Sequence, residues 1–193
     1  STGAQTYEAN DINITAGADV TFTTTNTAVE FQDGAAGQIV LSDDTDLIIT
    51  TSGGDITIAP TIAGTDSGGG NTAEDITLNA AGGTVTLSNT GAAVLATDIG
   101  DVTLTGATIA LSNSITSTGT NSAGNAATID INGAVTLNDN DITFTTGGAG
   151  IDFSSTIVSG STTPRALTIA QGAGAVVING NIGGTADNDV GNI

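Results

Sequence analysis

Apolar and polar residues alternate along most of this chain, with large aliphatic or aromatic residues recurring two positions apart. This alternation predicts β-strands with one buried side, and threonine usually fills the intervening, outward position. The spacing of three and four residues that marks an amphipathic helix does not recur over two turns. The predicted inward pairs are Ile12/Ile14, Val20/Phe22, Val29/Phe31, Ile39/Leu41, Leu47/Ile49, Ile56/Ile58, Ile76/Leu78, Val85/Leu87, Val102/Leu104, Ile109/Leu111, Ile129/Ile131, Val135/Leu137, Ile142/Phe144, Ile151/Phe153, Leu167/Ile169 and Val176/Ile178.

The spacing of these pairs favours one all-β architecture. Successive pairs often begin about seven to ten residues apart, which leaves room for short strands and corners but not for the strands and loops of a sandwich. Units this small cannot each bury a hydrophobic face alone, so they must stack. We therefore predict a β-solenoid, in the form of a right-handed parallel β-helix with about three short strands per coil.

A longer phrase recurs within this pattern and leads to four polar loops. A strand ends in an aliphatic residue or Phe, another Ile follows four residues on, and a polar stretch comes after it. We expect residues 1–193 to form one solenoid domain whose four loops emerge from a single corner and line one side. The phrases are Ile58/Ile62, Leu111/Ile115, Phe153/Ile157 and Ile178/Ile182, and the loops are residues 63–75, 116–128, 158–166 and 183–192.

The composition of the chain excludes several kinds of catalytic group, metal site and binding partner. The chain has 20 acidic residues, one basic residue, no His and no Cys, and its formal net charge is −19. An imidazole base, a thiolate nucleophile, a disulfide and a zinc site of the usual kind are thereby excluded. Nucleic acids and anionic membranes are poor partners for such a charge, and no apolar run approaches the ~20 residues of a membrane-spanning helix. A flexible acidic linker is the competing interpretation, against which stands the 38% hydrophobic content.

The start of the chain also bears on its origin. The first residues lack the charged start and apolar stretch of a signal peptide, and the chain contains no Met. We therefore expect a mature product or an excised segment of a longer protein.

Several short stretches resemble a known class of protein. They are "TGAQTY" (residues 2–7), "GAVTL" (133–137) and "GAGAVVINGNIGG" (172–184). These are similar to the β-strand repeats of large secreted bacterial surface proteins, namely filamentous-haemagglutinin-like adhesins and autotransporter passenger domains. The resemblance implies a β-helical fold and a bacterial cell-surface or extracellular location, and it supplies no catalytic residue. In the given residues we expect neither a secretion-directing amino-terminal domain nor the calcium-binding nonapeptide of repeats-in-toxin proteins, and in both respects the sequence departs from the resemblance.

Parallel β-helices also include polysaccharide lyases and glycosidases, so the carboxylates of this chain are candidate catalytic residues. A glycosidase needs two carboxylates about 5 to 10 Å apart, which neighbouring coils could supply from Asp130, Asp139, Asp141 and Asp152. Solvated turn residues are the simpler interpretation, because sugar sites usually also need aromatic and cationic partners. Only Tyr7 and Arg165 are left for those roles, since the four Phe occupy inward positions. We therefore predict no enzymatic activity.

Calcium binding is the sharper hypothesis for the acidic turns. Alternating Asp and Asn residues in a tight turn can direct side-chain and carbonyl oxygens at one hard cation. The competing interpretation is that these residues form turns and keep the protein soluble. The candidate ligands are Asp43, Asp44, Asp46, Asp98, Asp101, Asp139, Asp141, Asp187 and Asp189.

These observations favour a structural role. We expect a subunit or segment of an extracellular bacterial fibre or surface filament, stabilised by calcium. The fibre would be either one long covalent array or a polymer built by strand addition, in which residues 176–182 meet the first strands of the next molecule. The alternative is an adhesin spacer or binding module that recognises a glycan or another cell surface through its same-side loops.

Overall fold

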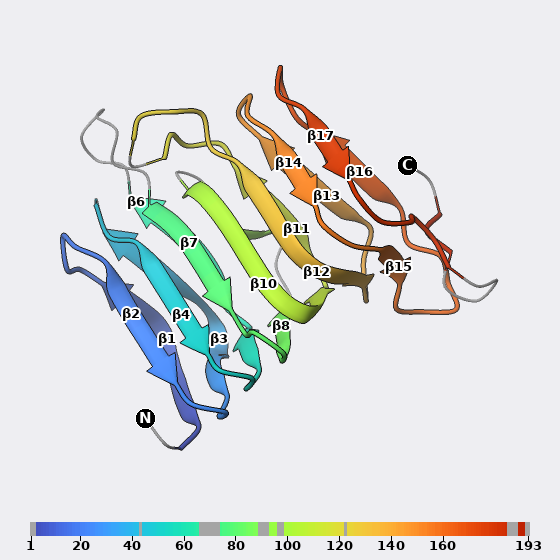
Figure 1. Cartoon of the computed structure of the whole chain (residues 1–193). Helices are drawn as coiled ribbons and strands as arrows, with labels where there is room; N and C mark the ends of the chain where they lie inside the picture. Colours follow the sequence, from blue (N-terminus) through green and yellow to red (C-terminus); the bar gives the residue numbers. More distant parts are fainter. Residues whose placement is uncertain are drawn as a thin grey trace.

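The computed structural model describes residues 3–42, 44–65, 74–88, 93–95, 99–121, 123–184 and 189–191, with the backbone alone for residues 33–36 and 93–95. In these ranges the protein is all-β with no helix, and its parallel strands stack into an elongated solenoid (Figure 1). It follows that no helix in the described ranges is long and apolar enough to cross a membrane.

The solenoid contains both short strands and long strands that bend. β1, β3, β10 and β12 are the long ones, and each runs across two sides of the solenoid. The strands are β1 Gln5–Ile14, β2 Val20–Thr24, β3 Val29–Ser42, β4 Leu47–Thr51, β5 Ile56–Ile58, β6 Thr61–Thr65, β7 Glu74–Asn79, β8 Thr84–Leu87, β9 Ala93–Leu95, β10 Ile99–Leu111, β11 Ser114–Ser117, β12 Ile129–Leu137, β13 Ile142–Thr146, β14 Ile151–Phe153, β15 Ile157–Ser159, β16 Leu167–Ala170 and β17 Val176–Ile178.

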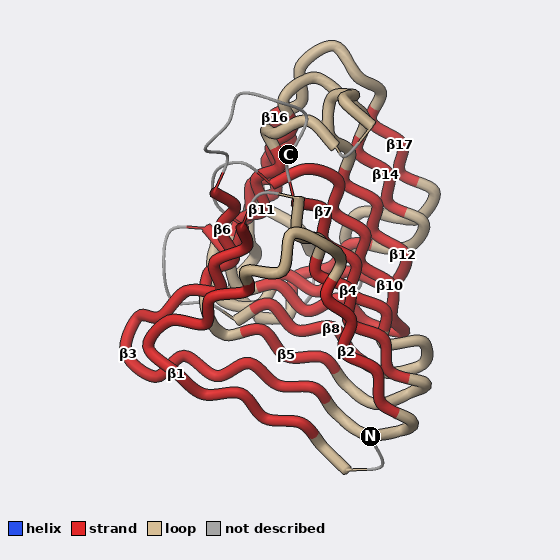
Figure 2. The backbone as a smooth tube through the Cα atoms, turned by 90° about the vertical axis from the view of Figure 1, so that its left-hand side faces the viewer, coloured by secondary structure: helices blue, strands red, loops and turns tan. Residues whose placement is uncertain are grey.

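The strand pairings define three faces, which Figure 2 shows as three sides of the tube. Face A contains the first halves of β1 and β3, then β5, β8, the second halves of β10 and β12, and β15. Face B contains the second halves of β1 and β3, then β6, β9, β11, β13 and β16. Face C contains β2, β4, β7, the first halves of β10 and β12, then β14 and β17.

Equivalent residues stack directly above one another on each face. On face C the first inward position forms one continuous row, and the chain completes about six turns along it. Every pairing between named strands is parallel, so the predicted parallel β-solenoid is confirmed. The row consists of Val20, Leu47, Ile76, Val102, Ile129, Ile151 and Val176.

The predicted inward pairs all lie in strands, and apart from the exposed Val176 their side chains form the core or pack against it. In the middle turns these residues are almost completely buried, Leu104 and Ile131 among them. Aromatic rings add to the core near both ends: Tyr7 stacks on Phe31 with ring centroids 4.8 Å apart, and Phe144 meets Phe153 edge-on at 4.9 Å. Stacking on the turns on either side therefore completes the burial of each turn's inward face, as stacked repeats require.

Buried threonines and small residues shape the corner between faces C and A. Thr24 Oγ1 donates a hydrogen bond to the carbonyl of Thr27, and Thr51 Oγ1, one turn on, donates to that of Gly54. A Cβ at Gly133 would lie 2.2 Å from the carbonyl oxygen of Gly106, so the backbones of neighbouring turns approach too closely there for any side chain. This corner is consequently tight and carries no long loop.

The sequence pattern missed four short strands, β6, β9, β11 and β15. β6, β11 and β15 each contain one inward Ile, but their next inward position holds Gly64, Ser117 or Ser159 in place of a second large residue. A motif of two large residues cannot detect such strands. They are buried by their neighbours in the stack and not by their own hydrophobicity.

The expectation that the four loops share one corner is wrong. Residues 63–75 and 116–128 connect face B to face C, whereas residues 158–166 connect face A to face B, and residues 183–192 follow Ile182, which pairs with Ile157 on face A. The physical reason is that the four-residue spacing between the last inward residue of one strand and the next Ile occurs at two different corners of the solenoid. It leads from face A to face B at Leu111/Ile115, but from face C to face A at Phe153/Ile157.

Candidate functional site

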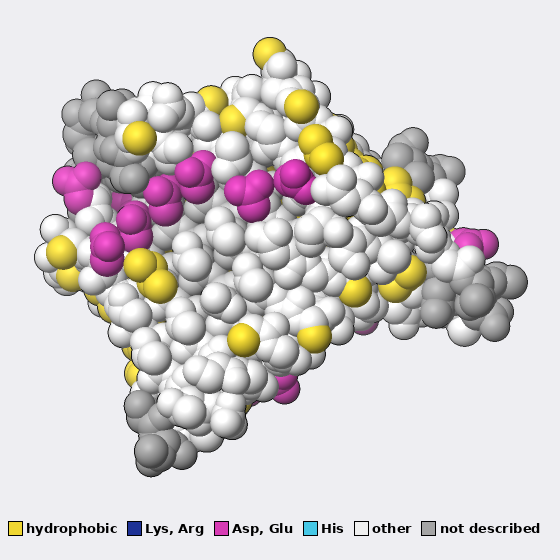
Figure 3. Space-filling model, viewed as in Figure 1, with side chains coloured by type: hydrophobic (Ala, Val, Ile, Leu, Met, Phe, Trp, Pro, Cys, Tyr) yellow, Lys and Arg dark blue, Asp and Glu magenta, His cyan; other side chains and the backbone are white. Residues whose placement is uncertain are grey.

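An acidic stripe runs along face C, on the side of the molecule that Figure 3 shows. Asp19, Asp46, Asp75 and Asp101 each immediately precede the first inward residue of a face C strand. Those inward residues pair in register, so the four aspartates stack one per turn, about 4.8 Å apart. Farther along the stripe, Asp130 and Asp152 occupy the next outward position of β12 and β14.

Hydrogen bonds link this stack from turn to turn. The backbone N–H of Asp75 donates to Asp46 Oδ1 at 2.9 Å, and the N–H of Asp101 donates to Asp75 Oδ1 at 2.6 Å. Asp101 Oδ1 accepts the backbone N–H of Thr128 at 2.7 Å and its hydroxyl at 3.0 Å, while Asn121 Nδ2 donates to Asp101 Oδ2 at 2.9 Å. The carboxylates therefore act as clamps between successive turns.

The same use of aspartate recurs on the other faces. Asp55 Oδ1 accepts the N–H of Thr84 on face A, and Asp141 Oδ1 accepts the N–H of Ala166 on face B, both at 2.8 Å. An aspartate directly before a strand thus accepts a hydrogen bond from the backbone one turn farther along. This arrangement explains part of the acidic excess as a structural device of the repeat.

Burial and neighbouring negative charges raise the pKa of a carboxyl group in the stripe. Burial is the largest cause that raises the pKa of Asp46, and the negative charges of Asp19 and Asp44 raise it further, against the lowering effect of the hydrogen bond from Asp75. Protonating a carboxyl group relieves both desolvation and repulsion. The negative charges around Asp46 therefore oppose its ionised form, and the hydrogen bond from Asp75 partly offsets them.

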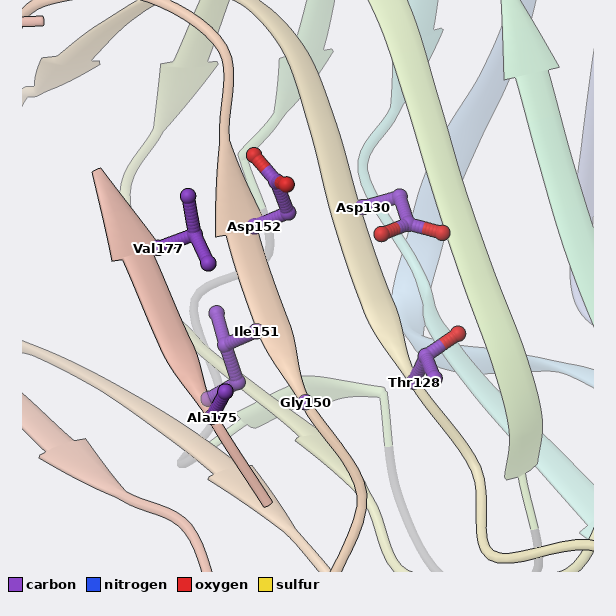
Figure 4. Close-up of a pocket in the computed structure, with 7 residues that line it drawn as sticks. All are labelled: Thr128, Asp130, Gly150, Ile151, Asp152, Ala175 and Val177. Carbon is purple, nitrogen blue, oxygen red and sulfur yellow. The ribbon is translucent and has the colours of Figure 1, made fainter. Parts of the chain in front are cut away.

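A shallow depression lies at the far end of the stripe (Figure 4). It has a volume of about 220 Å³, and Gly150 and Ala175 leave room for it between larger neighbours. Asp130, Asp152 and Val177 lie side by side along it on β12, β14 and β17. Burial raises the pKa of Asp130, and the charges of Asp152 and Asp101 add to the effect.

The structure brings together one of the carboxylate pairs considered for glycosidase chemistry. Asp130 and Asp152 are direct partners on neighbouring strands, and a raised pKa is a property of a general acid. The depression is lined by these two residues and by Thr128, Gly150, Ile151, Ala175 and Val177, without an aromatic or basic side chain. A sugar ring would therefore find carboxylates there but neither a stacking platform nor a cation.

The described calcium candidates are distributed over the molecule. Asp46 and Asp101 belong to the stripe, and Asp44 occupies a left-handed position, φ 60°, at the corner before β4. Asp139 accepts the hydroxyl of Ser112 at 2.9 Å, whereas Asp141 accepts a backbone N–H. Asp189 Oδ1 accepts the N–H of Gly184 at 3.4 Å. Asp43, Asp98 and Asp187 lie outside the described residues.

In the described ranges no three of these acidic groups come close enough together to hold a metal ion. The neighbouring acids Asp139 and Asp141 have different partners on different elements. Calcium binding thus stays a prediction.

Sequence reasoning missed the stacking of Asp19 and Asp75 with the other aspartates of the stripe. A signal was present, because "DVTF", "DLII", "DITL" and "DVTL" repeat the order aspartate, aliphatic, any residue, apolar. The interval between these phrases varies, so only the strand register shows that they are neighbours. No family model, curated protein or solved structure matches this chain.

Proposed function

We propose that this chain is a rigid structural segment of a fibre or surface filament, in which the solenoid supplies length. The observation that carries the proposal is the partial exposure of core positions in the first and last described turns. At one end Tyr7 and Phe22 remain only partly buried, and at the other Ile178 is partly buried while Val176 is 38% exposed. Additional solenoid turns would cover these core residues.

Among the described residues β17 offers an edge for such turns, whereas beside β16 the N–H of Gly191 already donates to the carbonyl of Arg165. The carbonyl of Ala175 accepts from β14 and the N–H of Asn179 donates to it, so the residues between them alternate in direction. Val176 and Ile178 accordingly direct their N–H and C=O groups away from β14. Ile182 pairs in parallel with Ile157, which begins a further turn on face A.

The added turn would come either from a longer covalent array or from another copy of the chain. In both versions β-strand addition supplies main-chain hydrogen bonds and continues the apolar rows. We expect this assembly outside a bacterial cell, on the basis of the sequence resemblance to secreted surface proteins. Calcium at the acidic turns would stabilise it further.

Electron microscopy of the purified chain, with calcium and after chelation, tests the polymer version. Long uniform filaments in calcium support assembly from separate copies, and their loss after chelation supports a clamping role for calcium. Short isolated rods in both conditions contradict self-assembly.

An edge variant tests the mechanism of assembly. Val176→Pro removes a donor that points away from β14, so it blocks strand addition without breaking an existing bond. Val176→Ala keeps that donor and is the matched control. Filaments that persist unchanged in Val176→Pro refute addition at this edge.

The second candidate is an adhesin. Its four loops do not share one side, so the loop-based version has lost its geometric support. The depression beside Asp130, Asp152 and Val177 remains a concave surface on which a cationic group with an apolar part, such as an amino sugar, would fit. Monomers that persist on dilution and bind a saccharide would favour this role over the fibre.

A further inference from the structure

We propose that Asn179 is a site of spontaneous modification, at which loss of ammonia gives aspartate or isoaspartate and blocks further strand addition. Asn179 directly follows β17, the last strand of face C, and Gly180 comes after it (Figure 1). The reaction requires no reagent except water. Its effect on assembly rests on the proposed fibre, whereas the reaction itself does not.

The reaction takes place between the asparagine side chain and the next peptide nitrogen. The nitrogen of Gly180 gives up its proton and attacks Cγ of Asn179, the Cγ–Nδ2 bond breaks, and the amide nitrogen leaves with that proton as ammonia. Water then opens the resulting succinimide ring at either carbonyl group, which gives aspartate or isoaspartate. Glycine favours the attack because no side chain hinders its nitrogen.

The backbone around Asn179 leaves the attacking group free. The N–H of Asn179 donates to the carbonyl of Phe153 at 2.8 Å. Two residues on, the carbonyl of Asn181 accepts the N–H of Ile157 at 2.9 Å. Gly180 between them directs its N–H to the other side, where no acceptor for it lies among the described residues. The nitrogen can therefore lose its proton without breaking a hydrogen bond, and the exposed Asn179 is open to water.

The chain contains the same sequence, Ile-Asn-Gly, at an equivalent place two turns earlier. Asn132 and Asn179 each directly follow the last residue of their strand that pairs with β14. Asn132 is also exposed, but its strand, β12, is paired with turns on both sides. A Cβ at Gly133 would lie 2.2 Å from the carbonyl oxygen of Gly106, which shows how closely the turns approach there. The two sites therefore share their chemistry and differ in whether a further turn covers them.

The product changes the outer edge of the solenoid in two ways. Nδ2 of Asn179 donates to Asp152 Oδ1 at 3.4 Å, so an oxygen in its place sets two carboxylates side by side. Isoaspartate also adds a methylene group to the backbone between β17 and Ile182, which disturbs the register of any turn added beyond them. An added turn, by contrast, supplies an acceptor for the N–H of Gly180 and protects Asn179. The modification therefore marks chain ends that no further turn has covered.

Mass spectrometry that distinguishes asparagine, aspartate and isoaspartate follows both sites in the full chain at mildly alkaline pH. We expect the folded chain to lose Asn179 at least about tenfold faster than Asn132, because the covered site reacts only when it opens locally. Chain unfolded in guanidinium chloride is the control, and there we expect equal rates. Equal rates in the folded chain, or faster loss of Asn132, would overturn the proposal.

Variants test the chemistry without disturbing the corner. Asn179→Gln keeps the amide but needs a larger ring, so we expect it to remove the fast release of ammonia while Asn132 reacts as before. Asn179→Asp reproduces the charge of one product without the added methylene group. A side chain at Gly180 is a poorer test, because its Cβ would lie 2.3 Å from the backbone of Ser155. Ammonia release that is as fast in Asn179→Gln as in the wild type would contradict the assignment.

Electron microscopy combined with the same mass spectrometry separates this inference from the fibre itself. We expect filaments to retain Asn179 longer than free chains do, and aged chains to form shorter filaments than fresh ones. Asn179→Gln should assemble equally well before and after ageing. Chains that lose Asn179 first but never form filaments support the modification and contradict the proposed fibre. Filaments that grow alike from fresh and fully modified chains refute the block of strand addition.

Discussion

Replacing Asp101 with alanine should weaken the clamp between successive turns of face C. The carboxylate accepts two hydrogen bonds from Thr128 and one from Asn121, at 2.7 to 3.0 Å. Hydrogen bonds to a charged group contribute about 1.5–3 kcal/mol when buried, and less for a half-exposed carboxylate, so the three together contribute about 3 kcal/mol. Relief of repulsion toward Asp130 returns up to about 1 kcal/mol. The net loss in unfolding free energy should be about 2 kcal/mol.

Asp130→Asn is the matched control in the same stripe. Burial and the charges of Asp152 and Asp101 raise the pKa of Asp130, so neutralising it should stabilise the fold. The gain should stay below about 1 kcal/mol because the side chain is only partly buried, and it should shrink at high salt.

Urea denaturation followed by circular dichroism measures both effects, at low and high salt. The hydrogen-bond interpretation requires that Asp101→Ala lowers the free energy of unfolding and that Asp130→Asn raises it. The decrease caused by Asp101→Ala should change little with salt concentration. If both variants are stabilised equally, the carboxylates act only as repelling charges and the clamp interpretation is refuted.

Three further predictions concern acid, core and backbone. Folding raises the pKa values of Asp46 and Asp130, so the folded state binds protons more readily than the unfolded state. The free energy of unfolding should therefore increase as the pH falls from 7 to about 4.5. A melting temperature that falls steadily over this pH range would contradict this prediction. Leu104→Ala should lower the free energy of unfolding, measured by urea denaturation, by about 2–5 kcal/mol, since the side chain is completely buried. A decrease below about 1 kcal/mol would mean that the neighbouring side chains move in to fill the cavity. Gly133→Ala should lower the melting temperature sharply because its Cβ would meet a backbone oxygen 2.2 Å away, whereas Gly82→Ala, with nothing within 4 Å, should leave it nearly unchanged; equal effects would refute the close-approach argument.

The sequence by itself determined the repeating element of this protein. Alternation fixes which side of a strand is buried, because neighbouring side chains point to opposite sides. Inward pairs such as Val102/Leu104 and Ile129/Ile131 were therefore predictable, and their short spacing implied stacking. The single inward Ile of β6, β11 or β15 gave no such signal, because those strands depend on burial by neighbours.

Only the tertiary structure decided which repeats lie above one another. The number of residues per turn varies, so the chain does not show that Asp46, Asp75 and Asp101 share one row, or that Asp130 faces Asp152. The same four-residue step also turns two different corners, which separated loops that looked equivalent. Local alternation is a property of neighbouring residues, whereas the surface of a solenoid is set by register between turns, through hydrogen bonds that join residues about 25 positions apart, as Ala166 to Asp141 does.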